Sequence, residues 1–312
     1  MSKILNFGSL NIDYVYTVPH FVMPGETLAA LERNVFAGGK GLNQSVAAAR
    51  AGGDVYHAGA IGKDDSKVLT DTIAANKIND ECLMRRDGPS GHTFIQVDTT
   101  GQNCILLYGG ANQSITCEEI DSTLKNFTKG DYLILQNEIN NIEYLIKSAA
   151  AKGMKVCFNV SPFTTQLLTL PLDKCAYLIV NEIEGSSMVN MPEDTDPYIL
   201  IEKLAAKFPK TSFVLTLGVR GSVLKLKERN DVISCKSFKV KAVDTTGAGD
   251  TFLGYLIANL AANADPKLAL KTAAAASAIA VTRKGAAPSI PLKEEVMEFL
   301  AKNKDEVLTD KI

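Results

Sequence analysis

Three consecutive segments decide the fold class: YLIL at Tyr132–Leu135, IEYLIKSAAA at Ile142–Ala151 and KVCFN at Lys155–Asn159. The first and third are short apolar runs of the kind that form buried strands, and the middle segment has the apolar period of a helix. A strand, a helix and a second strand in this order are typical of two parallel strands joined by a helical crossover. The stretch therefore predicts an α/β fold.

The same alternation extends in both directions along the chain. Further strands are predicted at Ile4–Gly8, Val55–Ala60, Tyr177–Val180, Ser212–Leu217, Val223–Lys227 and Val232–Val240. Further helices are predicted at Gly41–Arg50, Val68–Asn76, Glu118–Lys125, Glu182–Val189, Pro197–Lys207, Gly249–Ala262, Pro266–Thr282 and Lys293–Lys302. Continuous apolar strands separated by helices indicate a sheet that is buried on both faces. We therefore expect a single domain over residues 1–312, built on a central, mostly parallel sheet with helices on both faces, and a charged tail after Asn303 that frays.

Two segments interrupt this rhythm, near residues 12–36 and 92–108. Both alternate polar and apolar residues without an intervening helix, and the second reads as a hairpin around Thr99–Gln102. We expect them to form a small antiparallel β-sheet that projects from the main domain as a lid. Such a sheet has an apolar face, which needs cover from a ligand or from another subunit.

The composition excludes several classes of function. The chain has 312 residues, with 33 Lys and Arg against 35 Asp and Glu, so it lacks the basic footprint of a nucleic-acid-binding protein. Its six cysteines include no C-x-x-C pair and its three histidines are isolated, so a zinc site is not expected. The sequence shows neither a signal peptide nor an apolar stretch of about 20 residues, the length that spans a bilayer. We therefore expect a cytoplasmic protein with small-molecule ligands, no nucleic-acid partner and no membrane contact.

The strongest functional signal is DTTGAGDTF at Asp244–Phe252. A strand-like run ends near Val243, small residues follow, and a helix begins near Gly249. Glycines let several backbone N–H groups point outward, and the helix dipole adds positive charge, so this loop suits a developing phosphate charge. Asp250 stands at its rim as a candidate general base, and the alternative is that Asp250 only caps the helix.

A second glycine-rich cluster, AGGKGLNQ at Ala37–Gln44, opens another helix. Its backbone amides, Lys40 and Asn43 suit a ligand with many hydroxyl groups, although an ordinary helix start with a solvated lysine gives the same pattern. Asn11 and Asp13 follow the first strand and are either ligand contacts or turn residues. The chain contains no G-x-x-x-x-G-K-[ST] loop, and no G-x-G-x-x-G loop follows the first strand. These absences exclude a P-loop enzyme and disfavour a nucleotide-dependent oxidoreductase.

Together, the two clusters resemble the paired signatures of the ribokinase-like carbohydrate kinases. The likeness rests on GGKGLNQ at Gly38–Gln44 and DTTGAGD at Asp244–Asp250. It extends from GSLN at Gly8–Asn11 to AVTRKGAAPS at Ala280–Ser289, so it covers nearly the whole chain in the same order. The two signatures in combination are specific for this family.

The resemblance implies an ATP-dependent sugar kinase and gives roles to individual residues. Lys40 and Gln44 favour the ribokinase branch over the fructokinase, adenosine kinase and phosphofructokinase branches. The positions that match sugar contacts are Asn11, Asp13, Gly39, Lys40, Asn43, Glu138 and Asp250, of which Asp250 is also the catalytic base. The positions that match the ATP site and its anion hole are Asn181, Glu184, Thr216, Gly218, Gly221, Gly247, Ala248 and Gly249. The positions that match a monovalent-cation site are Asp244, Thr246, Ala280, Arg283, Gly285 and Ser289.

The same resemblance implies a reaction and its partners. We expect transfer of the γ-phosphoryl group of ATP to the 5-hydroxyl of ribose, with deoxyribose, another pentose, a hexose or a nucleoside as alternative acceptors. Mg²⁺ is expected to accompany ATP, and K⁺ is the expected activator. The lid corresponds to the segment through which ribokinase-like enzymes pair, so a homodimer is expected. A non-catalytic sugar sensor is the rival from another class, but it would have lost the base or the anion hole, and both are present here.

Overall fold

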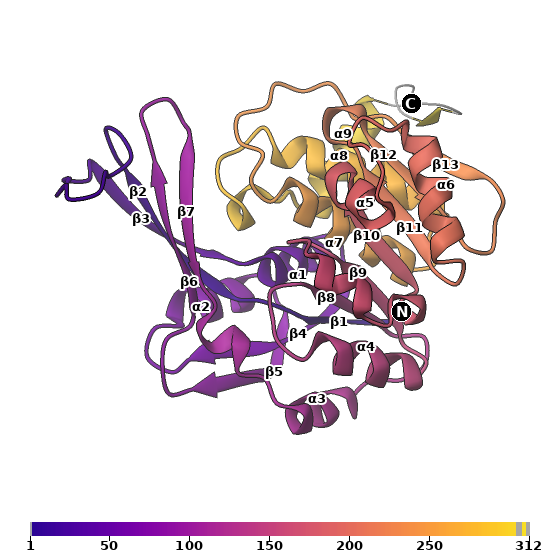
Figure 1. The fold of residues 1–312 in the computed structure, drawn as a ribbon, viewed down its shortest axis with the longest axis horizontal. Coiled ribbons are helices and arrows are strands. Elements are labelled where there is room, and N and C mark those ends of the chain that lie inside the picture. The colour runs from indigo at the N-terminus through magenta and orange to yellow at the C-terminus, as the bar shows by residue number, and fades with distance from the viewer. Residues whose placement is uncertain (1, 304–307, 310–312) are drawn as a thin grey trace.

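The computed structural model describes residues 2–303 and 308–309, which form two β-sheets and the helices around them (Figure 1). The strands of the larger sheet span Lys3–Phe7 (β1), Asp54–Gly62 (β4), Asn79–Arg86 (β5), Tyr132–Gln136 (β8), Lys155–Asn159 (β9), Tyr177–Asn181 (β10), Ser212–Thr216 (β11), Ser222–Lys225 (β12), Val232–Cys235 (β13) and Leu308–Thr309 (β14). Within the described ranges they lie in the order β14-β13-β12-β11-β10-β9-β8-β1-β4-β5. The strands from β11 to β5 in this order pair in parallel, and β12, β13 and β14 are antiparallel. The prediction of a mostly parallel central sheet is confirmed.

Helices cover both faces of this sheet, as predicted. They span Lys40–Arg50 (α1), Lys67–Ala75 (α2), Cys117–Leu124 (α3), Ile142–Ala151 (α4), Glu182–Val189 (α5), Pro197–Lys207 (α6), Ala248–Ala261 (α7), Pro266–Ala280 (α8) and Lys293–Lys302 (α9). Short 3₁₀ helices span Gly110–Gln113 (η1), Thr165–Thr169 (η2), Leu172–Lys174 (η3), Gly218–Arg220 (η4) and Ala287–Ser289 (η5). In the part of the chain that the structure describes, no helix has the length and apolar character needed to cross a bilayer.

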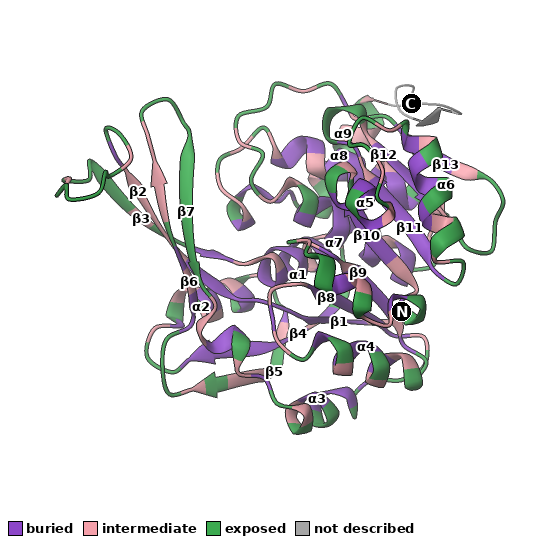
Figure 2. Ribbon diagram, viewed as in Figure 1, coloured by how far each residue is buried: buried purple, intermediate pink, exposed green. Residues whose placement is uncertain are grey.

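The interior strand β1 shows how the sheet is buried on both sides (Figure 2). Ile4 belongs to a buried cluster that includes side chains of α1, α2, α7, α8 and α9. Its neighbours Leu5 and Phe7 belong to a second cluster that includes side chains of α3, α4, α5 and α6. Ile4 thus faces one helical layer and Leu5 and Phe7 the other, as expected for a strand whose successive side chains point to opposite faces.

Helices α1 and α7 lie in close contact, and this contact positions the candidate site. A Cβ built on Gly254 of α7 would lie 2.4 Å from Ala47 Cβ and 2.7 Å from the Gln44 carbonyl oxygen of α1. A larger residue at this position would force the helices apart, because protein interiors have no spare volume. The close approach brings the first turn of α1, which contains Lys40, next to the first turn of α7, which contains Asp250.

The smaller sheet projects from the larger one as a lid (Figure 1). Its strands span Asn11–Thr17 (β2), Glu32–Gly38 (β3), Gly91–Val97 (β6) and Asn103–Tyr108 (β7), in the order β3-β2-β6-β7. The prediction that this sheet is antiparallel is wrong for its central pair, because β2 and β6 are parallel. Strand β2 follows β1 and strand β6 follows β5, so both leave the same edge of a parallel sheet and run in the same direction.

Other departures from the sequence prediction have simple causes. Strand β5 was not predicted, because it lies at the edge of the sheet and lacks a continuous buried run. All of its residues are described, and Cys82 is the only buried one among them. The strand predicted over Val232–Val240 ends at Cys235, since the following residues turn to line a cavity. The fraying predicted after Asn303 is wrong for Leu308 and Thr309, which pair with β13, and residues 304–307 and 310–312 lie outside the described residues.

Candidate active site

The carboxyl ends of five neighbouring parallel strands carry polar residues. Ser9 follows β1, Glu138 follows β8, and Asn159, Asn181 and Thr216 end β9, β10 and β11. Parallel strands bring their carboxyl ends to one edge of the sheet, which is where open α/β sheets bind ligands. The starts of α1 and α7 face the same edge, so helix N-termini and polar side chains meet there.

Asp250 lies in the first turn of α7 and is held by side chains of α1. Its Oδ1 accepts a hydrogen bond from Gln44 Nε2 at 2.8 Å, and its Oδ2 accepts one from Asn43 Nδ2 at 3.1 Å. Burial raises the pKa of Asp250, and the Lys40 ammonium and the two side-chain amides oppose that shift. Because both oxygens bind α1, the alternative that Asp250 only caps α7 loses support. The bond from Gln44 was not predicted from the sequence.

A cavity of about 220 Å³ lies beside Asp250. Lys40 and the residues expected to form an anion hole, Gly247, Ala248 and Gly249, line this cavity. Gly247 has a φ of 73°, in the left-handed region that favours glycine, and this conformation lets α7 start abruptly. The first N–H groups of α7 have no partner within the helix, and that of Ala248 donates to the Thr245 carbonyl at 3.2 Å. Together with Lys40, this helix start offers positive charge to a phosphoryl group.

The facing wall of this cavity comes from β9, β10, β11 and α5. Asn181, Glu184 and Thr216 were expected to contact ATP, and the structure places all three in this wall. Asn181 Oδ1 accepts a bond from the Glu184 backbone N–H at 2.8 Å, and the Glu184 carboxylate accepts one from the Asn181 N–H at 2.9 Å. This reciprocal cap fixes both side chains at the start of α5. Asn159 and Ser161 also line the cavity and were missed; only their position at or just after the end of a strand indicated them.

Two carboxylates stand where the lid leaves the main sheet. Glu138 accepts hydrogen bonds from Ser9 Oγ and, at 3.1 Å, from the Lys40 backbone N–H. Asp13 Oδ1 accepts a bond from Thr93 Oγ1 at 2.6 Å. Burial raises the pKa of Asp13 to about 6; the Thr93 bond opposes this shift and the Glu138 charge adds to it. Carboxylate oxygens in such positions suit ligand hydroxyl groups.

Asn11 and Gly39 complete the lid side of the site. Asn11 Oδ1 accepts a bond from Asn112 Nδ2 at 2.8 Å, and Asn112 also pairs with the backbone N–H and C=O of Leu10. With its oxygen occupied, Asn11 has its NH₂ group available as a donor. Gly39 has a φ of 90°, and a Cβ on it would come within 3.0 Å of backbone atoms of Ser9 and Asn11. A glycine is therefore needed for this close approach.

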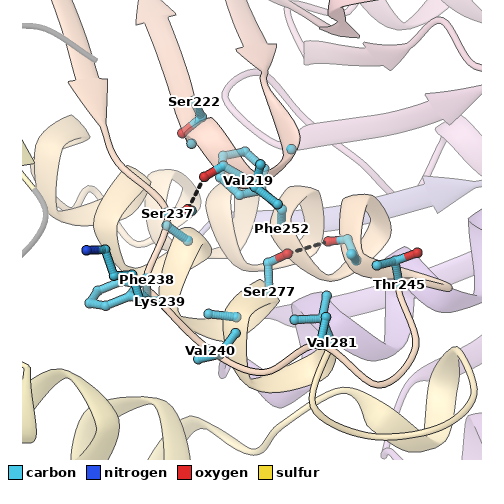
Figure 3. Close-up of a pocket in the computed structure, with 16 residues that line it drawn as sticks. Val219, Ser222, Ser237, Phe238, Lys239, Val240, Thr245, Phe252, Ser277 and Val281 are labelled. Carbon is cyan, nitrogen blue, oxygen red and sulfur yellow. Dashed lines mark hydrogen bonds between the residues drawn. The ribbon is translucent and has the colours of Figure 1, made fainter.

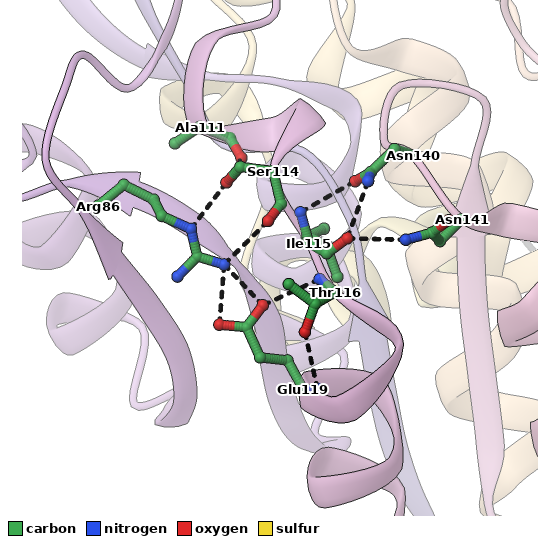
Figure 4. Close-up of polar contacts among 8 residues, drawn as sticks. All are labelled: Arg86, Ala111, Ser114, Ile115, Thr116, Glu119, Asn140 and Asn141. Carbon is green, nitrogen blue, oxygen red and sulfur yellow. Dashed lines mark hydrogen bonds and ion pairs between the residues drawn. The ribbon is translucent and has the colours of Figure 1, made fainter.

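A polar cluster behind the site supports the loop that carries Asn112 (Figure 4). Arg86, at the end of β5, forms an ion pair with Glu119 of α3 at 2.6 Å and donates to the hydroxyl and carbonyl oxygens of Ser114. Two asparagines of the β8–α4 loop bind the backbone of Ile115. These contacts hold residues 111–119 against the main sheet, and the sequence did not predict them.

A larger cavity of about 450 Å³ adjoins the first and shares Thr245 and Ala248 with it (Figure 3). Gly218 and Gly221, which were expected to contact the nucleotide, line it. Much of its wall is apolar and was not predicted, with contributions from Val219, Phe238, Val240, Phe252, Ala274, Ala278 and Val281. A mainly apolar cavity joined to an anion-binding one suits a nucleobase that carries a phosphate chain.

Two loops that were expected to bind a monovalent cation meet next to α7. Asp244 accepts hydrogen bonds from the backbone N–H groups of Thr246, at 2.9 Å, and Gly285, at 2.8 Å. Burial raises the pKa of Asp244, but these bonds outweigh it, so the pKa is lowered overall and the carboxylate is ionised at neutral pH. The backbone of Val243 also bonds to the carbonyl of Val281, which ties the two loops together.

The remaining expected cation ligands lie at the end of α8 and in the segment that follows it, and their polar groups are already engaged. The Arg283 guanidinium pairs with Glu295 of α9, and the Arg283 backbone N–H donates to the Ala280 carbonyl at 3.0 Å. Ser289 Oγ donates to the Ala286 carbonyl at 2.8 Å. Residues 2–303 and 308–309 contain no cluster of three or more His, Cys, Asp or Glu side chains that could hold a metal. Any cation ligands here would therefore be largely backbone carbonyls, a donor set that suits a hard cation.

Comparisons with known proteins agree with this geometry. The model of the pfkB family carbohydrate kinases matches residues 1–293. The chain is 34% identical to a ribokinase of Haemophilus influenzae over 308 residues, which covers 96% of this chain and 99% of the relative. It is 29% identical to a deoxyribokinase of Salmonella typhi over 309 residues, covering 95% and 98%. Its structure matches that of Arabidopsis thaliana ribokinase complexed with ribose and ATP with a TM-score of 0.85 and 27% identity, over 96% of this chain and 98% of the other. The chain therefore belongs to the pfkB family of carbohydrate kinases, and it is a sugar kinase.

Proposed function

We propose that this sugar kinase transfers the γ-phosphoryl group of ATP to the 5-hydroxyl of ribose. The observation that carries the proposal is the position of Asp250, whose carboxylate is held by two α1 amides beside the anion-binding cavity. Ribose as the acceptor is supported by the similarity to the Haemophilus influenzae ribokinase and to the Arabidopsis thaliana ribokinase complexed with ribose and ATP.

In the proposed reaction, the sugar occupies the space between the lid and the strand ends. Its hydroxyl groups bind Asn11, Asp13, Gly39, Lys40, Asn43 and Glu138. Asp250 accepts the proton of the 5-hydroxyl while that oxygen bonds to the γ-phosphorus and the bond from phosphorus to the bridging oxygen of ADP breaks. The backbone amides of Gly247–Gly249 bind the negative charge that develops on the transferred group. The lid excludes water, which limits hydrolysis of ATP.

Two kinds of cation fit the residues around this cavity. Glu184 and Asn181 supply oxygen atoms on the wall facing Asp250, and Mg²⁺ commonly binds one or two carboxylates together with nucleotide phosphates. When bound with ATP, Mg²⁺ would neutralise phosphate charge. The loops around Asp244 and Gly285 would hold K⁺ through carbonyl oxygens, and K⁺ there would stabilise the start of α7. We therefore propose Mg²⁺ as the companion of ATP and K⁺ as an activator.

A second acceptor has specific support. The similarity to a deoxyribokinase makes deoxyribose the main alternative, ahead of another pentose, a hexose or a nucleoside. Ribose and deoxyribose differ by one hydroxyl group. A site that binds this hydroxyl loses affinity when it is missing, because its polar partners are then left unpaired.

The substitution Asp250→Asn tests the central role of the carboxylate. It keeps the shape of the side chain but removes its ability to accept a proton, so kcat is expected to fall by about 10²–10⁴. Coupled measurement of ADP release with ribose gives kcat, and thermal unfolding checks that the fold survives. A variant with near-normal turnover would remove Asp250 from the mechanism.

The acceptor and the activator are separated by one set of assays. ADP release is measured with ribose, deoxyribose, other pentoses, hexoses and nucleosides, each with and without K⁺ and with and without Mg²⁺. Ribose is expected to give the highest kcat/KM, K⁺ to increase it, and omission of Mg²⁺ to abolish turnover. A higher kcat/KM for deoxyribose would reassign the substrate and leave the role of Asp250 intact.

We also propose that the lid pairs two copies of the chain as a homodimer. All six residues of β7 are exposed, and Leu106 is 70% exposed although it lies in a strand (Figure 2). Strand β7 is the free edge of the lid sheet, and a free apolar edge is stabilised by pairing with another strand. Sedimentation should give twice the chain mass for the wild type and the chain mass for Leu106→Asp. A monomeric wild type would contradict the proposal.

We propose a cytoplasmic location, which is supported by the state of the thiols. All six cysteines lie in the described ranges and none is in a disulfide. Unpaired cysteines are usual in the reducing cytoplasm. Cell fractionation with detection of the full chain should recover it with cytoplasmic markers, and recovery with secreted proteins would refute the location.

A further inference from the structure

A chain of buried side-chain amides connects the central sheet to Asp250. Gln44 of α1, which donates to Asp250 Oδ1 at 2.8 Å, accepts through its Oε1 a bond from Gln136 Nε2 at 2.7 Å. Gln136 ends β8, and its Nε2 also donates to Asn6 Oδ1 of β1 at 3.0 Å. Asn6, Gln44 and Gln136 are completely buried, so no solvent competes for these bonds.

The direction of every bond in this chain is fixed by its two ends. At one end, Asn6 Nδ2 donates to the Gly41 carbonyl at 2.8 Å, and a carbonyl can only accept. At the other end, Gln44 directs its Nε2 at Asp250 Oδ1, so its Oε1 faces Gln136 and can only accept. Gln136 must therefore direct its NH₂ group at both Asn6 and Gln44. If Gln136 were turned over, its oxygen would face two other oxygens.

This arrangement leaves one acceptor without a partner. Gln136 Oε1 has no hydrogen-bond partner among the described residues, and it lies against Gly8, where a Cβ would come within 2.3 Å of it. A buried acceptor without a partner destabilises a fold, because its bond to water is lost and not replaced. An apolar residue of similar size would avoid that cost. The presence of glutamine at position 136 is therefore explained by the two hydrogen bonds that its NH₂ group donates.

We propose that Gln136 is a positioning residue for phosphoryl transfer: it fixes Gln44 as a hydrogen-bond donor to Asp250 and so keeps the carboxylate oriented and ionised. The proposal rests on the proposed role of Asp250 as general base. Gln44 without Gln136 is free to turn its oxygen toward Asp250, and two facing oxygens are tolerated only when the carboxyl group is protonated. Gln136 itself touches neither substrate and acts only through Gln44.

The charged groups around Asp250 are the background against which this effect is measured. Lys40 of α1 favours the ionised carboxylate, and Glu138 after β8 disfavours it. Glu184 of α5 lies in the wall of the same cavity. None of these groups bonds to Gln136, so a change at Gln136 leaves their charges in place.

Gln136→Met is the main test, because methionine has a similar volume and cannot donate. The acid limb of the pH profile of kcat, measured with both substrates saturating, reports the pKa of the base in the substrate complex and is not affected by the change that Asp13 causes in the KM for the sugar. Loss of one bond to a charged acceptor is expected to move this limb upward by about one pH unit. We expect kcat to fall about tenfold through loss of orientation, with the KM for the sugar changed less than about threefold. An acid limb that stays in place would overturn the proposal.

Two further variants separate positioning from simple loss of stability. Thr211→Val removes another buried bond, from Thr211 Oγ1 to the Leu172 carbonyl at 3.1 Å, far from Asp250 at the amino end of β11. It should lower the melting temperature without moving the pH profile. Gln44→Met removes the donor to Asp250 directly and should move the acid limb as Gln136→Met does. If Gln136→Met does not fold, an unmoved acid limb in Gln44→Met overturns the proposal on its own.

The double variant tests whether Gln136 acts only through Gln44. In a Gln44→Met background, Gln136→Met should produce no further shift of the acid limb, because the effects of residues in one chain are not additive. Additive shifts would overturn the proposed route. Asp250→Asn separates failure of the proposed base from failure of the positioning role. Full activity of Asp250→Asn would remove Asp250 as the base. An inactive Asp250→Asn together with an unmoved acid limb in Gln136→Met would remove only the role proposed for Gln136.

Discussion

On the proposed sugar side of the active site, hydrogen bonds position the groups, whereas around the larger cavity, which is proposed to hold the nucleobase and is called the nucleotide side below, packing does. Asp250, Asp13 and Glu138 each accept bonds from neighbouring side chains or backbone N–H groups. The nucleotide cavity is lined largely by apolar side chains such as Val219 and Ala278. The sugar side therefore presents a few acceptors and donors in fixed directions, and the nucleotide side presents a cavity of defined shape.

The two constructions serve different needs of a kinase. A sugar is recognised by its hydroxyl groups, so the protein must present acceptors and donors in fixed directions, and each of them needs support from behind. A nucleobase has two apolar faces, and burying them contributes affinity without directional contacts. Single polar substitutions should therefore damage the sugar side far more than the nucleotide side.

The largest effect after loss of the base is expected for Asp13→Asn. In the proposed site, ionised Asp13 would accept a hydrogen bond from a sugar hydroxyl, and a hydrogen bond to a charged group contributes about 1.5–3 kcal/mol. Loss of this bond should raise the KM for the sugar by about 10- to 100-fold and leave the KM for ATP unchanged. Steady-state kinetics with each substrate varied in turn measure both. Asp87→Asn, at an exposed carboxylate paired with Lys63, is the matched control and should change neither.

Because the pKa of Asp13 is raised, the difference between the sugar side and the nucleotide side is expected to depend on pH. The pKa of Asp13 is about 6, chiefly because of burial, so the carboxylate becomes protonated as the pH falls through that value. The KM for the sugar should rise as the pH falls from 7 to 5, and this rise should be absent in Asp13→Asn. An equal rise in the KM for ATP, or a pH dependence that persists in the variant, would contradict the assignment.

The sugar side was largely visible in the sequence for the same physical reason. Asp250, Lys40 and Asn43 are residue types that carry chemistry, and they stand in glycine-rich stretches that begin helices. The rule that ligands bind beyond the carboxyl ends of parallel strands then predicted the edge of the sheet at which the site lies. The supporting residues Gln136 and Asn112 were missed, because a glutamine at a strand end or an asparagine in a loop gives no local signal.

On the nucleotide side, the sequence indicated glycines, Ala248 and a few polar residues, but not the apolar wall of the larger cavity. Gly218 and Gly221 were found, but Phe238, Ala278 and Val281 are ordinary core residue types, and only the folded chain brings them around one cavity. The parallel pairing of β2 and β6 was hidden for a related reason. It depends on which edge of the main sheet each strand leaves, and a pattern of alternating residues does not contain that information.

Filling the nucleotide cavity should weaken ATP binding, which single polar substitutions are expected to change little. Ala278 of α8 lines the cavity, so Ala278→Phe places a ring in the space expected for the base. The KM for ATP should rise at least about tenfold, which corresponds to about 1.4 kcal/mol of lost binding, while the KM for the sugar stays the same. Leu268→Phe, on the same helix but 52% exposed, is the control for a bulky ring on α8. Equal effects of the two variants would place the base elsewhere.

The smallest effect is expected for Ser277→Ala, a polar deletion in the wall of the same cavity. Ser277 Oγ donates to the Ala248 carbonyl at 3.0 Å, next to the start of α7 (Figure 3). Its loss should lower stability by about 0.5–1.5 kcal/mol and change the KM for ATP less than about threefold, because shape and apolar contact remain. Chemical denaturation and ATP titration measure the two quantities. If the KM for ATP rose tenfold or more, the nucleotide side would also depend on one directional bond, and the difference between the two sides would disappear.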